Sequence, residues 1–133
     1  MIEAQGGDSA AFDDRSRFPR ARLQRDVVAE ADGYVEHLDA LTVAHACTIL
    51  GAGRERKGDP IDLAVGVVLQ ARVGDRVTRG QPLATLHASE EARLAEAVRA
   101  VCSAISFSAT RVEVPPLILE RLGASTASAA ARR

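Results

Sequence analysis

The residues best suited to chemistry lie in a charged, glycine-rich segment, Leu50-Gly-Ala-Gly-Arg-Glu-Arg-Lys57. Its glycines allow backbone N–H groups to approach a ligand closely, and its cationic side chains suit an anion such as phosphate. It is not a Walker loop, because no Gly-Lys-Ser/Thr follows, and the chain has no GxGxxG after a strand. Binding of an anion, or contact with a neighbouring domain, is one interpretation of this segment. The candidate residues are Gly51, Ala52, Gly53, Arg54 and Lys57.

The same segment also has a purely structural interpretation. Gly51 is suited to end a helix and Gly53 to form a turn. The cationic side chains would then be solvated, or paired with Glu55, Asp59 and Asp62. Both interpretations stay open at the level of the residues.

Lys57 is the only lysine of the chain, which raises the question of a covalently attached cofactor. The segment Gly74-Asp-Arg-Val-Thr-Arg-Gly-Gln-Pro-Leu83 resembles the hairpin of biotinyl and lipoyl carrier domains. Those carriers need a lysine at a hairpin tip, whereas Lys57 lies elsewhere and lacks a Met-Lys-Met or Asp-Lys-Ala setting. The pattern therefore indicates a strand–turn–strand architecture, and no cofactor is expected.

The histidines have no spacing typical of catalysis. His37 and His45 are expected on or near the surfaces of their elements, and His87 is placed to bridge to Glu90 or Asp75. A catalytic histidine needs a nucleophile or an orienting carboxylate within reach, and the sequence names neither. We therefore predict no catalytic residue in this chain.

The composition argues against several classes of partner. The net charge of −1, an aromatic content of 3% and the absence of Trp disfavour nucleic-acid binding. No run reaches the roughly 18 apolar residues of a membrane span, and the first residues lack a signal-peptide pattern, so we expect a cytoplasmic protein. Cys47 and Cys102 lack the spacing of metal ligands and are predicted to be buried small hydrophobes.

The elements that must position the glycine-rich segment begin with two short strands within residues 27–38, about a turn at Ala31-Asp-Gly33. Asp39 is a candidate N-cap for a helix that runs to Leu50, and Gly51 ends it. Residues 61–73 are mostly apolar, which predicts a strand buried on both faces.

The second half of the chain predicts a turn, strand, turn and strand within residues 73–87. Ser89 is expected to cap the second main helix, whose first turn carries acidic residues that suit the helix dipole. Residues 111–114 are a further strand candidate. The predicted apolar face of the helix consists of Leu94, Val98, Val101, Cys102 and Ile105.

The whole pattern predicts an α+β domain of short, mostly antiparallel strands with two main packed helices, of barrel-sandwich or hammerhead type. Residues 27–122 form the domain, and residues 123–133 form a low-complexity tail expected to be disordered. Residues 1–26 are expected to be a connecting segment. The first four residues are similar to the last turn of a helix ended by Gly6, which indicates the remnant of a larger protein.

Several short segments follow one another along the chain in a distinctive order. They are Gln5-Gly-Gly-Asp8, Asp32-Gly-Tyr-Val35, Leu50-Gly-Ala-Gly-Arg54, Asp59-Pro-Ile-Asp62, Ala64-Val-Gly66, Gly74-Asp-Arg-Val77, Gly80-Gln-Pro-Leu83 and Leu86-His-Ala88. Taken in this order, they resemble the C-terminal domain of pyrimidine nucleoside phosphorylases, and within that family the bacterial thymidine phosphorylases. The resemblance covers residues 1–122, nearly everything but the tail.

This resemblance implies a homodimeric enzyme that splits thymidine or a related nucleoside with phosphate as co-substrate, releasing the base and a deoxyribose 1-phosphate. The family's catalytic residues lie in its α and α/β domains, whose motifs this chain lacks, so none is carried over and the chain alone is expected to be inactive. What carries over is the loop at Gly51, Ala52, Gly53 and Arg54, in the part that closes over the cleft. Such closure would exclude water from the reaction.

A second reading is a freestanding module that binds an anion or a partner through residues 51–57. A carrier domain modified at Lys57 is a third. A phosphorylase C-terminal domain is expected to have the catalytic domains of the same enzyme as its partners. Binding to nucleic acid or to a membrane is not expected.

Overall fold

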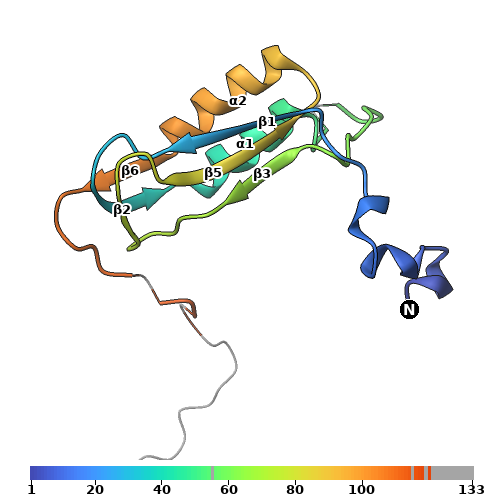
Figure 1. The fold of residues 1–133 in the computed structure, drawn as a ribbon, viewed down its shortest axis with the longest axis horizontal. Helices are drawn as coiled ribbons and strands as arrows, with labels where there is room; N and C mark the ends of the chain where they lie inside the picture. The colour runs from blue at the N-terminus through green and yellow to red at the C-terminus, as the bar shows by residue number, and fades with distance from the viewer. Residues whose placement is uncertain (55, 115, 119, 121–133) are drawn as a thin grey trace, which may run out of the picture.

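The computed structural model of the chain describes residues 1–54, 56–114, 116–118 and 120. Within them the α+β prediction is confirmed: two helices accompany two three-stranded antiparallel sheets, and the sheets do not close into a barrel (Figure 1). Short 3₁₀ turns precede the first strand, at Glu3–Gln5, Ser9–Phe12 and Arg15–Arg17. The predicted disordered tail, residues 123–133, lies outside the described residues.

The first sheet has the order β1 (Leu23–Val28), β5 (Pro82–Ala88), β3 (Gly66–Leu69). The central strand β5 is antiparallel to both neighbours, and Leu86 lies opposite Arg25 on β1 and Val67 on β3. The predicted strand over residues 61–73 is therefore mostly wrong. Only β3 is regular, and it is an edge strand on which Val68 is 52% exposed. An apolar run does not by itself distinguish an edge strand from a central one.

The second sheet has the order β4 (Arg76–Val77), β2 (Gly33–Leu38), β6 (Ile105–Ser108). The strands of the predicted segment 73–87 are thus present but belong to different sheets. The further strand lies at β6 and not at the predicted residues 111–114. Sequence patterning missed β6 because it begins two residues after the second helix ends and looks like a continuation of its apolar face.

The two strands predicted about Ala31-Asp-Gly33 exist, but they do not pair as a hairpin. β1 begins at Leu23 and belongs to the first sheet, whereas β2 belongs to the second. The connection between them is held by residues from another part of the chain: the Asp32 carboxylate accepts a hydrogen bond from the Arg79 N–H at 2.8 Å. Long-range contacts therefore override the local preference of Asp-Gly for a tight hairpin.

The helices are α1 (Ala40–Leu50) and α2 (Glu91–Ser103), which pack side by side. The Asp39 cap of α1 is confirmed: its carboxylate accepts hydrogen bonds from the Leu41 N–H at 3.1 Å and the Thr42 hydroxyl at 2.5 Å. The predicted Ser89 cap of α2 is wrong, since Glu90 occupies the N-cap position without a side-chain cap bond. No helix among the described residues is long and apolar enough to cross a bilayer.

The main core lies between the first sheet and the two helices. Its buried residues are Val27, Ala46, Leu50, Ala84, Leu86, Ala88, Leu94, Ala97 and Val101. A second core joins the second sheet to the start of β5 and consists of Ala29, Val35, Ala71, Val77 and Leu83. Ile105 packs against both. The predicted burial of the cysteines is only partly right, since Cys47 is half-buried but Cys102 is exposed.

Candidate functional site

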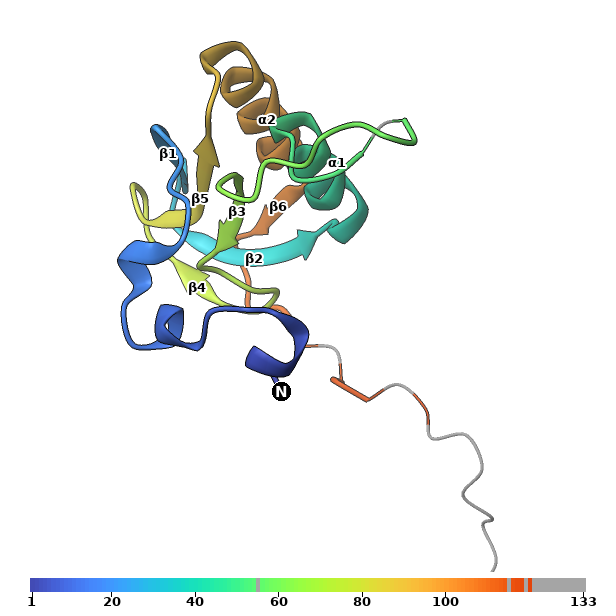
Figure 2. The same ribbon diagram turned by 90° about the vertical axis from the view of Figure 1, so that its right-hand side faces the viewer.

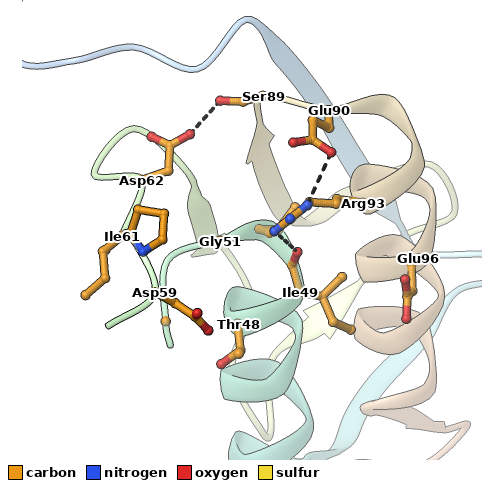
Figure 3. A pocket seen from close by; sticks show the side chains of 13 residues that line it. Thr48, Ile49, Gly51, Asp59, Ile61, Asp62, Ser89, Glu90, Arg93 and Glu96 are labelled. Atoms are coloured by element: carbon orange, nitrogen blue, oxygen red, sulfur yellow. Dashed lines mark hydrogen bonds and ion pairs between the residues drawn. The ribbon is translucent and has the colours of Figure 1, made fainter. Parts of the chain in front are cut away.

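A depression of about 640 Å³ lies where the end of α1, the following loop and the start of α2 meet (Figure 3). Gly51 and Gly53 line it, as do residues that follow β5. Of the other predicted site residues, Ala52, Arg54 and Lys57 are not among the lining residues, and Arg54 and Lys57 are exposed. The structure therefore brings two of the five candidates to this depression.

The loop over residues 51–62 is tied together at its base. Gly51 has φ = 102° and ends α1, with the Gly51 N–H bonded to Thr48 O and the Ala52 N–H to Cys47 O, both at 2.9 Å. This is the Schellman arrangement, which a glycine makes without strain. The Asp62 N–H returns to donate to Gly51 O at 3.0 Å, so that the ends of the loop meet as in an Ω-loop.

Gly53 is required by a close approach to α1. A Cβ atom added at Gly53 would lie 2.8 Å from the Thr48 hydroxyl oxygen, too near for any larger residue unless Thr48 shifts. The glycines that suggested an anion site thus have structural duties at Gly51 and Gly53, as the structural interpretation proposed.

Asp62 fixes the base of the loop to the junction between β5 and α2. One of its carboxylate oxygens accepts a hydrogen bond from the Ala64 N–H at 2.9 Å, and the other accepts one from the Ser89 hydroxyl at 2.7 Å. The Ser89 hydrogen bond and then the Ala64 N–H lower the pKa of Asp62, because both stabilise the carboxylate. Figure 3 shows the Asp62 and Ser89 side chains pointing toward each other.

Arg93, which lines the depression, connects the two helices. Its guanidinium lies 3.3 Å from the Glu90 carboxylate and donates to Ile49 O at 3.4 Å, at the end of α1 where the helix dipole favours a cation. Both charged side chains are exposed, so this ion pair contributes little to stability. Its effect is to orient Arg93.

The lining is acidic, which was not predicted. Among the lining residues that the structure describes, the acidic ones are Asp59, Asp62, Glu90 and Glu96, and the one cation is Arg93, which is already engaged by Glu90. An anion entering the depression would meet like charges, so the depression itself does not suit phosphate. The cationic residues predicted to attract anions are carried instead by the outer part of the loop.

The sequence did not predict how the loop over residues 51–62 is connected to the segment between β5 and α2. The Asp62-Leu-Ala64 turn has a local signal, because Asp favours hydrogen bonds to its own backbone two residues on. The bond between Asp62 and Ser89 joins residues 27 positions apart and has no local signal. Ser89 was instead assigned to the helix cap that its position before Glu90 and Glu91 indicates.

The histidines lie apart from this depression. His37 and His45 are exposed, as predicted. His87 is half-buried and lies 3.4 Å from the Gln24 side-chain nitrogen, so the expected partners Glu90 and Asp75 are not its partners. Among the residues that the structure describes, no three His, Cys, Asp or Glu side chains gather as a metal site.

Comparison with known proteins identifies the domain. The sequence model of the family described as "Pyrimidine nucleoside phosphorylase C-terminal domain" matches residues 34–108, from β2 through β6. The pyrimidine-nucleoside phosphorylase of Geobacillus stearothermophilus is 40% identical over 122 residues, which is 92% of this chain and 28% of the relative. That of Bacillus subtilis is 47% identical over 91 residues, 68% of this chain and 21% of the relative.

A third relative, the pyrimidine-nucleoside phosphorylase of Staphylococcus aureus strain USA300, is 39% identical over 118 residues, covering 89% of this chain and 27% of the relative. The chain thus spans between about a fifth and little more than a quarter of the length of these relatives. The match includes the loop over residues 51–62 and both helices. The chain belongs to the pyrimidine nucleoside phosphorylase C-terminal domain family.

Proposed function

We propose that this chain acts as the C-terminal domain of an enzyme that splits thymidine or another pyrimidine nucleoside with phosphate, releasing the base and a pentose 1-phosphate. The observation that carries the proposal is the family match over residues 34–108. It is supported by three similar proteins named pyrimidine-nucleoside phosphorylases. Catalytic α and α/β domains would supply the reacting groups, in an enzyme that assembles as a homodimer.

Within that enzyme, the loop over residues 51–62 would form one edge of the substrate cleft. Its base is fixed by Asp62 and Ser89, and its outer part carries exposed Arg54 and Lys57. Figure 2 shows the segment between α1 and β3 projecting from the body of the domain. A fixed base with cations outside suits a loop that closes on an anionic co-substrate and excludes water while the glycosidic bond breaks.

Different segments of the chain would have different roles in that enzyme. Residues 27–122, together with the first part of β1 (Leu23–Val28), would be the folded C-terminal unit, and the residues before β1 would connect it to the catalytic domains. Gly51, Ala52, Gly53, Arg54 and Lys57 would face the cleft without taking part in proton or group transfer. Their contribution would be to closure alone.

A chimera tests the proposal. The matched C-terminal region of the Geobacillus stearothermophilus enzyme is replaced by this chain, and thymine release from thymidine and phosphate is measured. We expect the chimera to be active, and both this chain alone and the Geobacillus enzyme lacking its C-terminal region to be inactive. An inactive but folded chimera, or turnover by the isolated chain, would contradict the proposal.

The alternative of a freestanding anion-binding module is tested on the isolated chain. Phosphate is titrated while the backbone amide resonances of residues 51–57 are followed. The depression is acidic, and Arg54 and Lys57 lie exposed outside it, so phosphate has no enclosed cationic site among the described residues of the isolated chain and we expect no saturable shift. Saturable shifts confined to the loop, together with an inactive chimera, would favour the alternative.

A further inference from the structure

The outward face of α1 is unusual because it carries no charge. The helix Ala40–Leu50 contains no Asp, Glu, Lys or Arg. Its exposed residues are Ala40, Leu41, Ala44 and His45, and Leu41 is 82% exposed. Leu41, Ala44 and His45 follow the i, i+3, i+4 spacing of one helix face, so they form a contiguous uncharged stripe.

The neighbouring helix shows how this same chain builds a helix surface that meets water. α2 packs beside α1, and its exposed positions include Glu91, Arg93, Glu96 and Arg99. A helix with one apolar face and one charged face is the ordinary pattern for a surface helix, whereas a helix that is apolar all round is normally buried. By this comparison α1 is the helix whose outer side is suited to being covered.

The stripe on α1 leads directly to the loop. Thr48 lies on the same face, one turn beyond Ala44 and His45, and lines the depression at the base of the loop. It also sets the close approach of Gly53 described above. A body that covers the stripe would therefore reach the loop as well, so that one partner is expected at both.

We propose that the face formed by Leu41, Ala44 and His45 docks on the catalytic portion of the enzyme, which would be the part of its relatives that precedes the region matched here. This inference rests on the proposed function, and the face would be the surface by which the C-terminal domain contacts the catalytic portion. The aligned region is 28% of the Geobacillus stearothermophilus enzyme, so most of that enzyme is available to cover this face. Its contact surface would be apolar and uncharged, because an unpaired charge facing Leu41 would lose its hydration without compensation.

Chemical labelling of histidine tests the docking directly, since His45 lies on the stripe and His37 is exposed on β2. Diethyl pyrocarbonate is applied to the isolated chain and to the chimera, and each modified histidine is quantified by mass spectrometry. We expect His45 to react in the isolated chain and to react about tenfold more slowly in the chimera, corresponding to about 1.4 kcal/mol of docking. His37 reports the reactivity of a histidine outside the stripe.

A pair of matched variants of the chimera completes the test. Leu41→Glu places a charge on the stripe and is expected to restore labelling of His45 and to raise KM or lower kcat. Leu117→Glu is the same substitution at a residue that is 100% exposed and lies outside the family match, and it is expected to change neither. Because Leu41 is itself largely exposed, the isolated Leu41→Glu chain should keep its helical circular dichroism.

The activity and labelling results together separate the docking face from the proposed function. An active chimera in which His45 labels as fast as in the isolated chain overturns the docking face and leaves the proposed function standing. A folded chimera without activity overturns the proposed function, and the docking face with it. Labelling of His45 that slows in the isolated chain as its concentration rises, without further slowing in the chimera, assigns the stripe to a second copy of this chain and overturns the proposal.

Discussion

At the scale of single residues, Ser89 shows the limit of reading a helix start from sequence. Ser followed by two glutamates is a good cap pattern, and Asp39 with Thr42 shows that such patterns succeed when all partners are local. The Ser89 hydroxyl instead binds the Asp62 carboxylate across the fold. The glycines of the site were predictable because their roles are local. The acidic lining of the depression was not, because its residues come from separate segments that meet only in the folded chain.

The hydrogen bond between Ser89 and Asp62 predicts a pH dependence of the loop. The pKa of Asp62 is lowered in the folded chain, so the bond's stabilisation is complete above the ordinary pKa of an aspartate, about 4. It is lost as the pH falls through the lower, folded-state pKa. We expect the amide resonance of Ala64, whose N–H donates to the Asp62 carboxylate, to titrate in that acidic range, and Ser89→Ala to move its midpoint upward.

Ser103→Ala is the control, because the Ser103 hydroxyl donates only to Ala100 O within α2. It should leave the midpoint of the Ala64 resonance where it is in the unmodified chain. A midpoint that is the same in Ser89→Ala and in the unmodified chain would show that the Ser89 hydroxyl does not hold the loop.

At the scale of elements, both helices were predictable and the sheet pairings were not. Each helix is recognised within its own segment by apolar spacing and end residues. The pairing of β1 with β5 and of β2 with β6 joins residues that are 54 to 74 positions apart in the chain. The Asp-Gly turn pointed to the nearest partner, β1 with β2, which the fold does not use.

The central position of β5 predicts a large cost for Leu86→Ala. Leu86 is 0% exposed and lies in the core between the first sheet and the helices. We expect the free energy of unfolding, measured by urea denaturation, to fall by about 2–5 kcal/mol, through lost burial and the cavity left behind.

The matched control is Leu63→Ala, at a residue that is 81% exposed, with an expected change within about 0.5 kcal/mol. Equal costs for the two substitutions would contradict the assignment of the core.

At the scale of the whole molecule, the described residues hold two buried clusters and not one. Ile105, at the start of β6, packs against both clusters and lies opposite Leu38 in the second sheet. The chain is therefore expected to unfold as a single unit because Ile105 and its strand couple the two cores.

Ile105→Ala tests this coupling with two probes. Tyr34 is the only tyrosine and the chain has no Trp, so intrinsic fluorescence reports on the second sheet, whereas far-ultraviolet circular dichroism is dominated by the helices. We expect coincident urea transitions in the unmodified chain and separated transitions in Ile105→Ala. Val28→Ala, at an exposed β1 residue, should keep the two curves together. Coincident curves in Ile105→Ala would assign the coupling to other contacts.

The strand pairing also determines when a nascent chain can fold. Leu23 can pair with β5 only after Ala88 has been synthesised, which completes the first sheet. Leu38 can pair with β6 only after Ile105 has been synthesised. Until residue 108 has left the ribosome, β2 lacks β6, and its central residue Val35 has no Phe107 opposite it. Synthesis at about 5–20 residues per second leaves these apolar segments unpaired for several seconds. Chaperones bind exposed apolar segments of this kind during that interval. The domain is therefore expected to complete its fold only late in synthesis, after β6 has joined β2.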